Sequence, residues 1–218
     1  MKDYPVNPTI YNPLPENKFK WEWYERDFFH SKDGTKEFPE HHCKLTWKAS
    51  IPFIKGFRNA IDIGCRDGEY TRYLHHDFQH VFCFDYRKRK LFQRNVDLSK
   101  VTHFKCGLGE KEQILKVSGG GSMFSEGKRK KENWVPTHIF TLDQFNLQNI
   151  DYIKIDVDGF EVRVLQGAKN TILKNKPLLV IEAENGDTSG INYIEQTFNY
   201  EIAAWDSLNR NVVMQEKK

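Results

Sequence analysis

From about residue 56 onward, short apolar segments alternate with helical patterns, and this alternation constrains the fold more than any other feature of the chain. The segments "NAIDIG", "HVFCFDY", "VTHFKCGLG", "IDYIKIDVDG" and "KPLLVIEAE" have the length and apolar content of buried strands. Intervening helical patterns, such as "EYTRYLHHDF" and "FEVRVLQGAKNTILKN", require crossovers that place helices on both faces of a parallel sheet. The last segment, "YEIAAWDSLNRNVVM", indicates two strands around a polar turn. We therefore predict an α/β fold with a doubly wound, mostly parallel seven-stranded sheet and an antiparallel C-terminal hairpin.

The first 55 residues differ from the rest, because they are rich in proline and aromatic residues and mostly lack periodicity. Within them, "HHCKLTWKASIPFI" has apolar residues at helical spacing, namely Cys43, Trp47, Ile51 and Ile54. We predict an N-terminal extension over residues 1–55 that caps a Rossmann-like domain over residues 56–218.

Composition narrows the class of protein. The 218 residues are 39% hydrophobic and 29% charged, which is typical of a globular domain, and no apolar run is long enough to span a bilayer. The N-terminal residues lack the apolar core of a secretion signal, so we expect a cytoplasmic protein. The four cysteines lack the paired spacing of a zinc site or a disulfide framework, and we expect buried thiols and no metal. The net charge of +3 does not indicate nucleic acid, and the basic runs "RKRK" and "KRKK" are typical of solvated faces.

Glycines and acidic residues stand where the first two predicted strands end. Gly64 and Gly68 follow the strand that contains Asp62, and they allow a ligand to approach the backbone at a helix N-terminus. Asp85 ends the second strand, where a carboxylate can accept both hydroxyls of a ribose. Tyr86 follows and packs either against an adenine ring or in the core.

The third predicted strand ends in "CGLG", where the backbone of Gly107 and Leu108 can meet an adenine edge. In a doubly wound sheet these three strand ends lie side by side, so an adenosine site explains them best. Arg66, however, occupies the position of the middle glycine that a dinucleotide's pyrophosphate requires. S-adenosylmethionine carries no phosphate. We therefore assign the turn, including Cys65 and Arg66, to that cofactor, with Arg66 either facing its carboxylate tail or exposed to solvent.

The densest signal is "DYIKIDVDGFEVRVLQGA", in which Lys154 and Asp156 alternate with apolar residues along one strand. Asp156 should lie at the carboxyl end of that strand, and the next strand brings Glu182 and Glu184 to the same rim. A buried lysine–carboxylate pair is costly, which favours a functional role, although an ion pair that only orders the strand ends remains the alternative. We predict that Asp156 is the base or anchors the cofactor, that Lys154 and Glu182 orient it, and that Asp158 and Glu184 face the substrate.

With these residues identified, the sequence from about Asn59 to the C-terminus resembles the FkbM-type methyltransferases, class I enzymes that use S-adenosylmethionine. The segments that carry the resemblance are "IDIGCRDGEYT", "FCFDY", "CGLG", "TLDQF" and "DYIKIDVDGFEVRVLQGA" followed by "KPLLVIEAE". Asp158 departs from the pattern, because the family has a glutamate there. The resemblance implies O-methylation of a sugar or another small hydroxyl compound, and it extends to phage-encoded members of similar length. We place Ser122, in the glycine-rich loop "SGGGSMFSEGKRKK", on the substrate side.

Three other functions remain open at this stage. The basic runs and the Lys–Asp–Glu rim would also suit 2′-hydroxyl methylation of RNA. A non-catalytic binding module could keep the fold, although the series of glycines and carboxylates argues against that reading. A nicotinamide-dependent dehydrogenase is the last alternative, which Arg66 disfavours.

Overall fold

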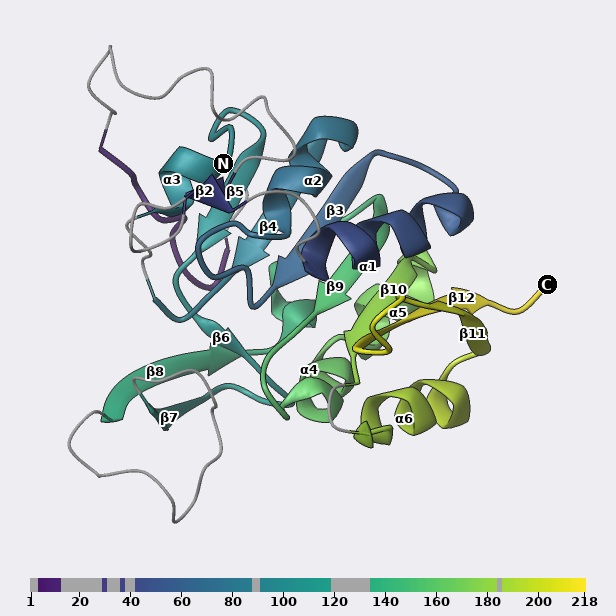
Figure 1. Ribbon diagram of the computed structural model, residues 1–218. Helices are drawn as coiled ribbons and strands as arrows, with labels where there is room; N and C mark the ends of the chain where they lie inside the picture. The colour runs from purple at the N-terminus through teal and green to yellow at the C-terminus, as the bar shows by residue number, and fades with distance from the viewer. Residues whose placement is uncertain are drawn as a thin grey trace.

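The structure is a computed structural model, and it describes residues 4–12, 29–30, 36–37, 42–87, 91–118, 134–183 and 186–218. A seven-stranded sheet with the strand order β11-β12-β10-β9-β3-β4-β5 forms its centre (Figure 1). Five neighbouring strands are parallel, and only β12 runs antiparallel, between β10 and β11. The predicted fold class is therefore confirmed. The strands are β3 (Asn59–Ile63), β4 (His80–Phe84), β5 (Val101–Phe104), β9 (Ile150–Ile155), β10 (Leu178–Glu182), β11 (Tyr200–Trp205) and β12 (Asn211–Glu216).

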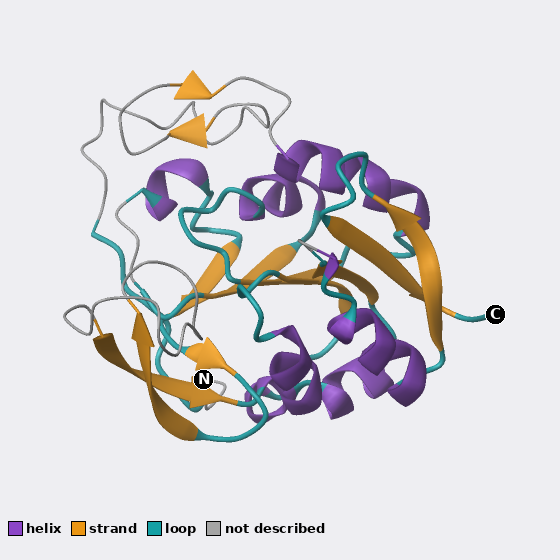
Figure 2. Ribbon diagram, turned by 60° about the horizontal axis from the view of Figure 1, so that its bottom comes forward, coloured by secondary structure: helices purple, strands orange, loops and turns teal. Residues whose placement is uncertain are grey.

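Helices cover both faces of this sheet, as the nearly edge-on view in Figure 2 shows. One face packs against α1 (His42–Ser50), α2 (Thr71–Asp77) and α3 (Phe92–Asn95), with a core that includes Trp47, Tyr73 and Tyr152. The other face packs against α4 (Glu161–Gly167), α5 (Lys169–Asn175) and α6 (Ser189–Thr197). Both faces of the central strands are buried, which explains their nearly continuous apolar sequences.

A second sheet of three strands lies beside the central one and was not predicted (Figure 1). It contains β6 (Gly107–Leu108), β7 (Gln113–Ser118) and β8 (Trp134–Phe140), in the order β6-β8-β7. The prediction that "VTHFKCGLG" forms one strand was therefore wrong, because the chain leaves the central sheet after β5 and pairs with β8. The predicted substrate residue Ser122 belongs to the connection between β7 and β8 and lies outside the described residues.

The single helix predicted over residues 160–175 is in fact two helices that meet at Ala168. The break coincides with a close approach, since a Cβ on Gly167 would lie 1.9 Å from the carbonyl oxygen of Gly109. The carboxylate of Asp143 accepts the N–H groups of Asn170 and Thr171 at 3.0 and 2.8 Å, which satisfies free donors at the start of α5. These contacts give a structural reason for the "LQGA" and "TLDQF" segments.

Residues 4–12 and helix α1, both within the predicted N-terminal extension, contact the central sheet and its hairpin. Residues 4–12 follow the edge strand β5, where the N–H of Thr9 donates to the carbonyl of His103 and the Tyr11 hydroxyl lies 2.6 Å from the His103 ring. Helix α1 is held near the β11–β12 turn by a hydrogen bond from Thr46 to Asp206. The extension also contains the two-residue strands β1 (Phe29–His30) and β2 (Lys36–Glu37).

The helix predicted around Cys43 is confirmed, but it ends earlier than its apolar pattern suggested. Cys43 and Trp47 are buried, whereas Ile51 starts a 3-10 helix (Ile51–Phe53) and is 41% exposed. Pro52 in this segment cannot donate a backbone hydrogen bond, which is consistent with the end of α1 at Ser50. Among the described residues, every helix is too short or too polar to cross a bilayer.

Candidate active site

The candidate site lies at the point where the order of the parallel strands reverses. β3 and β9 are neighbours at the centre of the sheet, and the helices that follow them cover opposite faces. Ligands of doubly wound folds bind beyond the carboxyl ends of such strands. The turn over residues 64–70 follows β3 here, and the turn over residues 156–160 follows β9.

Glycine is required where these two turns meet. Gly64 has a φ of +85°, and a Cβ on it would lie 1.8 Å from the carbonyl oxygen of Asp156. Gly68 has a φ of +84°, and a Cβ there would lie 2.8 Å from a methyl group of Val96. The two glycines thus let the first turn approach both the turn after β9 and the segment after α3.

Arg66, in the position of the middle glycine, also adopts the left-handed backbone, with a φ of +45°. Its N–H donates to Asp85 at 3.1 Å, and its guanidinium lies 3.5 Å from Glu69. Asp85 is buried and also accepts the N–H of Arg87 at 2.7 Å. Asp85 therefore connects the end of β4 to the turn that follows β3.

The predicted site residue Asp62 lies beneath the turn, and only 1% of it is exposed. It accepts a hydrogen bond from the Thr71 hydroxyl at 2.6 Å, so it connects β3 to the first turn of α2. Burial raises the pKa of Asp62 to about 6, although the Lys154 ammonium and the Thr71 hydroxyl lower it. Asp62 is therefore placed to order the turn over residues 64–70 without contacting solvent.

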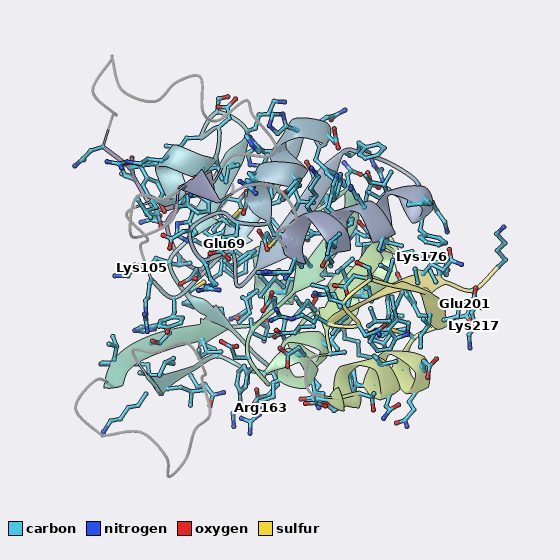
Figure 3. The ribbon with its side chains drawn as sticks, in the orientation of Figure 1. Glu69, Lys105, Arg163, Lys176, Glu201 and Lys217 are labelled. Carbon is cyan, nitrogen blue, oxygen red and sulfur yellow. The ribbon has the colours of Figure 1, made fainter. Side chains whose placement is uncertain are left out.

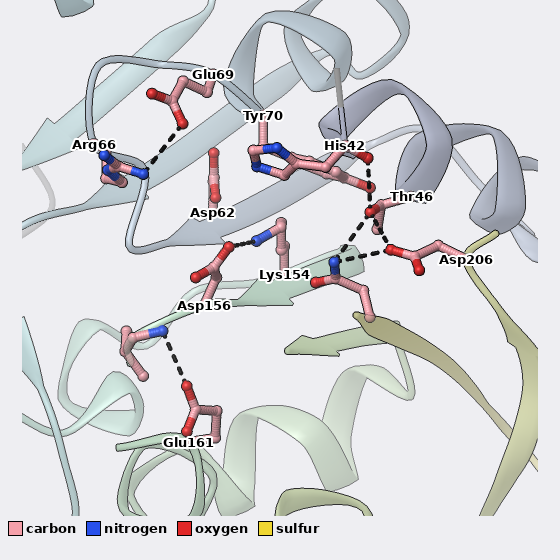
Figure 4. Close-up of polar contacts among 12 residues, drawn as sticks. His42, Thr46, Asp62, Arg66, Glu69, Tyr70, Lys154, Asp156, Glu161 and Asp206 are labelled. Atoms are coloured by element: carbon pink, nitrogen blue, oxygen red, sulfur yellow. Dashed lines mark hydrogen bonds and ion pairs between the residues drawn. The ribbon is translucent and has the colours of Figure 1, made fainter. Parts of the chain in front are cut away.

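Lys154 and Asp156 form an ion pair at the carboxyl end of β9, with a distance of 2.5 Å between Nζ and Oδ2 (Figure 4). The lysine side chain is 4% exposed, whereas that of Asp156 is 32% exposed. Burial lowers the pKa of Lys154, but the carboxylates of Asp156 and Asp62 prevail and hold it above the ordinary value. Burial raises the pKa of Asp156, but the Lys154 ammonium and a hydrogen bond with Glu182 hold it below the ordinary value. The site therefore presents an ionised, partly exposed carboxylate beside a buried ammonium group.

Glu182, at the end of β10, completes this rim. Burial and the neighbouring Asp156 carboxylate raise the pKa of Glu182 to about 8, although Lys154 lowers it. Asp156 and Glu182 interact through a hydrogen bond, so the two carboxyl groups share one proton near neutral pH. Lys154, Asp156 and Glu182 are thus brought together as predicted.

The raised pKa of Glu182 makes stability depend on pH. A carboxyl group whose pKa rises from 4.5 to about 8 on folding stabilises the fold below pH 4.5 and loses this contribution as the pH approaches 8. The free energy of unfolding should therefore fall less between pH 4.5 and 8 in Glu182→Gln than in wild type. Urea unfolding at a series of pH values measures it. Part of the pH dependence should persist in the variant, because Asp62, with its pKa of about 6, still titrates in this range.

The control for this prediction is Glu195→Gln, which removes an exposed carboxylate on α6 and should follow the wild-type pH dependence. Equal slopes in wild type and Glu182→Gln would show that Glu182 titrates in the folded protein as it does in the unfolded chain.

Several residues that the sequence analysis did not single out support this rim. The hydroxyls of Tyr70 and Tyr152 lie 2.5 Å apart, and Tyr152 donates to Ser50 at the end of α1. The Lys154 ammonium lies 5.1 Å from the centre of the Tyr70 ring, which is within cation–π range. Glu161 accepts the N–H groups of Val157 and Gly159 at 3.1 and 3.2 Å and so orders the turn after β9. The sequence offered no signal for the tyrosines beyond their aromatic character.

A family model decides what kind of protein has this site. Residues 85–208, more than half of the chain, match the model described as the methyltransferase FkbM domain. The chain belongs to the FkbM methyltransferase family. Among curated proteins, none matches the chain.

Solved structures share the fold of this FkbM methyltransferase at low identity. An FkbM methyltransferase from Methylobacillus flagellatus is 19% identical with a TM-score of 0.51, and the match covers 72% of this chain and 42% of that one. A precorrin 8W decarboxylase from Methanobacterium thermoautotrophicum is 12% identical with a TM-score of 0.52 over 88% of this chain and 97% of that one. The chain thus spans less than half the length of its FkbM neighbour.

S-adenosylmethionine is the cofactor of the FkbM methyltransferase, and the carboxyl ends of β3, β4 and β9 fit it. Gly64 and Gly68 let the first turn close against the turn after β9 and the segment after α3, and Asp85 at the end of β4 accepts the N–H of Arg66 in that turn. Tyr86 is half-buried, and the Arg87 guanidinium lies 4.7 Å from the centre of its ring.

The remaining predicted site residues differ in exposure. Cys65 and Leu108 are buried, and Gly107 is half-buried at the start of β6. Asp158 is exposed with a φ of +54°, and Glu184, like Ser122, lies outside the described residues.

Proposed function

We propose that this FkbM methyltransferase transfers the methyl group of S-adenosylmethionine to a hydroxyl of a sugar or another small acceptor. The observation that carries this proposal is the partly exposed Asp156 carboxylate, which Lys154 holds at 2.5 Å beside the titratable Glu182. An oxygen acceptor must lose a proton as it becomes nucleophilic, and a positioned carboxyl pair can take that proton. Membership of the FkbM family indicates S-adenosylmethionine as the methyl donor, and the carboxyl pair supports a hydroxyl group as the acceptor.

The site residues would have distinct roles in this reaction. Gly64, Gly68 and Asp85 would hold the cofactor, which when bound supplies a methyl group on a positively charged sulfur. Lys154 keeps Asp156 ionised and fixes its orientation, so that Asp156 accepts a hydrogen bond from the acceptor hydroxyl or from the amino group of the cofactor. The pKa of Glu182, about 8, is closer to neutral pH than that of Asp156. Because that value lies above neutral pH, Glu182 is mostly protonated there, so the ionised Asp156 would take the hydroxyl proton while Glu182 keeps its hydrogen bond to Asp156.

The test is methyl transfer from labelled S-adenosylmethionine to panels of glycans, small hydroxyl compounds and RNA. We expect alkali-stable label on a glycan or small hydroxyl compound, because methyl ethers resist alkali while methyl esters do not. Asp156→Asn should lower the rate about 100-fold or more, since it removes the ionised carboxylate. Glu195→Gln is the control and should leave the rate unchanged.

Two outcomes would contradict the proposal. Label found only on RNA, with binding that weakens steeply as salt is added, would instead indicate a 2′-hydroxyl methyltransferase. A wild-type rate in Asp156→Asn would remove that carboxylate from the mechanism.

A further inference from the structure

Three metal-binding side chains meet where the N-terminal extension approaches the cofactor turn. His42 and Cys43 are the first residues of α1, and Glu69 precedes α2. One ligand atom from each residue, an imidazole nitrogen, the Cys43 Sγ and a carboxylate oxygen, lies within 4.8 Å of the other two. Figure 3 labels Glu69 close to the region where α1 and α2 approach each other, and Figure 4 shows His42 and Glu69 above the Lys154–Asp156 pair.

The separations of these atoms are close to those of a zinc site. Bond lengths of about 2.0–2.3 Å in a tetrahedral site place neighbouring ligand atoms roughly 3.3–3.8 Å apart. An upper separation of 4.8 Å is therefore on the order of 1 Å too wide. His42 and Glu69 are half-buried, so their side chains have room to adjust, whereas Cys43 is buried and fixed in the core. Three protein ligands would leave a fourth position open.

The charges around Cys43 favour a divalent cation. Lys154 provides one positive charge, while Glu69, Asp156 and Asp62 provide three negative charges. Lys154 is already paired with Asp156 at 2.5 Å and the Arg66 guanidinium lies 3.5 Å from Glu69, so the buried Asp62 leaves an excess of one negative charge. Burial raises the pKa of the Cys43 thiol, and a bound metal would displace the thiol proton to solvent.

We propose that His42, Cys43 and Glu69 bind one zinc-like divalent cation, which connects the N-terminal extension to the turn that precedes α2. The ligand types select this class of ion, because thiolate and imidazole suit Zn²⁺ and Co²⁺, whereas Mg²⁺ and Ca²⁺ prefer oxygen ligands. The site lies close to the Asp156 rim, because Glu69 directly precedes Tyr70, whose ring centre lies 5.1 Å from the Lys154 ammonium. Cysteine spacing alone predicted no metal here, and it does not detect ligands such as these, which come from two distant segments.

Titration of untagged, metal-stripped protein with Co²⁺, followed by competition with Zn²⁺, tests the site. We expect one equivalent of Co²⁺ to bind with a thiolate-to-cobalt charge-transfer band, and Zn²⁺ to abolish that band. His42→Ala, Cys43→Ser and Glu69→Gln should each weaken binding at least about tenfold, since each removes a ligand. Cys106→Ser is the matched control, because it removes a buried thiol from the opposite core and should bind Co²⁺ as wild type does.

Cys43→Ser removes a buried group and could prevent folding, so the two variants at half-buried positions keep the test decisive. Zn²⁺ should raise the thermal unfolding midpoint of wild type and have a smaller effect on His42→Ala and Glu69→Gln. Absence of a thiolate band in wild type, or unchanged affinity in His42→Ala and Glu69→Gln, would overturn the proposal. These measurements need neither acceptor nor cofactor, so their result is independent of the proposed methyl transfer.

Discussion

Lys154→Met is expected to lower the free energy of unfolding by about 3–5 kcal/mol at neutral pH, because it removes one partner of a buried ion pair. The Lys154 side chain is 4% exposed, and its ammonium lies 2.5 Å from Asp156. Without it, the ionised carboxylates of Asp156 and Asp62 lose the nearest positive charge. Since the pKa of Lys154 lies above its ordinary value, the ammonium group stabilises the folded state throughout the neutral range.

The effect of Lys154→Met should depend on pH in a defined direction. Asp62, with a pKa of about 6 in wild type, should titrate at a higher value once Lys154 is gone. Protonation then removes the buried charge, so the deficit relative to wild type should shrink as the pH falls from that higher value to about 6. Chemical unfolding at several pH values measures this difference.

Two further variants separate the ion pair from other effects of Lys154→Met. Lys174→Met, which removes an exposed lysine on α5, should change stability little. The double variant Lys154→Met/Asp156→Asn should recover part of the loss, because the two side chains interact directly. Equal stability of Lys154→Met and wild type would mean that the pair contributes nothing.

The central sheet could be predicted because its strands carry an unambiguous signal. β9 and β10 are buried on both faces, and such strands read as short apolar runs between helical patterns. The β7–β8 hairpin has no such pattern, since Ile114 on β7 is 60% exposed and Val135 on β8 is 49% exposed. The helix break at Ala168 also escaped prediction, because the close approach of Gly167 to Gly109 involves a segment far away in the sequence.

Some residues of the candidate site could likewise be predicted from the sequence, and others could not. Lys154, Asp156 and Glu182 could be placed because neighbouring parallel strands end at the same edge of the sheet, and strand alternation sets the direction of each side chain. Tyr152 was not recognised as part of the site, because its partners Tyr70 and Ser50 come from the first turn and from α1. Packing of α1 brings His42 beside Glu69, although the two residues lie in separate segments of the sequence. Contacts such as these join segments that are distant in the sequence, so only the tertiary structure reveals them.

Gly64→Ala is expected to abolish measurable binding of S-adenosylmethionine, because it changes the backbone at the point where β3 and β9 diverge. Its Cβ would lie 1.8 Å from the carbonyl oxygen of Asp156, which no side-chain rotation can relieve. The φ of +85° adds a conformational cost of about 1–2 kcal/mol for an L-residue. The first turn must therefore move away from the turn after β9, and the cofactor would lose both the glycine backbone and the position of Asp156.

Gly186→Ala separates the conformational cost from the collision. Gly186 has a φ of +77°, but a Cβ there would meet nothing within 4 Å. We expect Gly186→Ala to lose about 1–2 kcal/mol of stability and to bind the cofactor as wild type does. Calorimetric titration with S-adenosylmethionine and chemical unfolding without it would be compared for both variants. Wild-type affinity in Gly64→Ala would place the cofactor away from the β3–β9 junction. Equal loss of affinity in both variants would mean that the contact between Gly64 and Asp156 has no special part in binding.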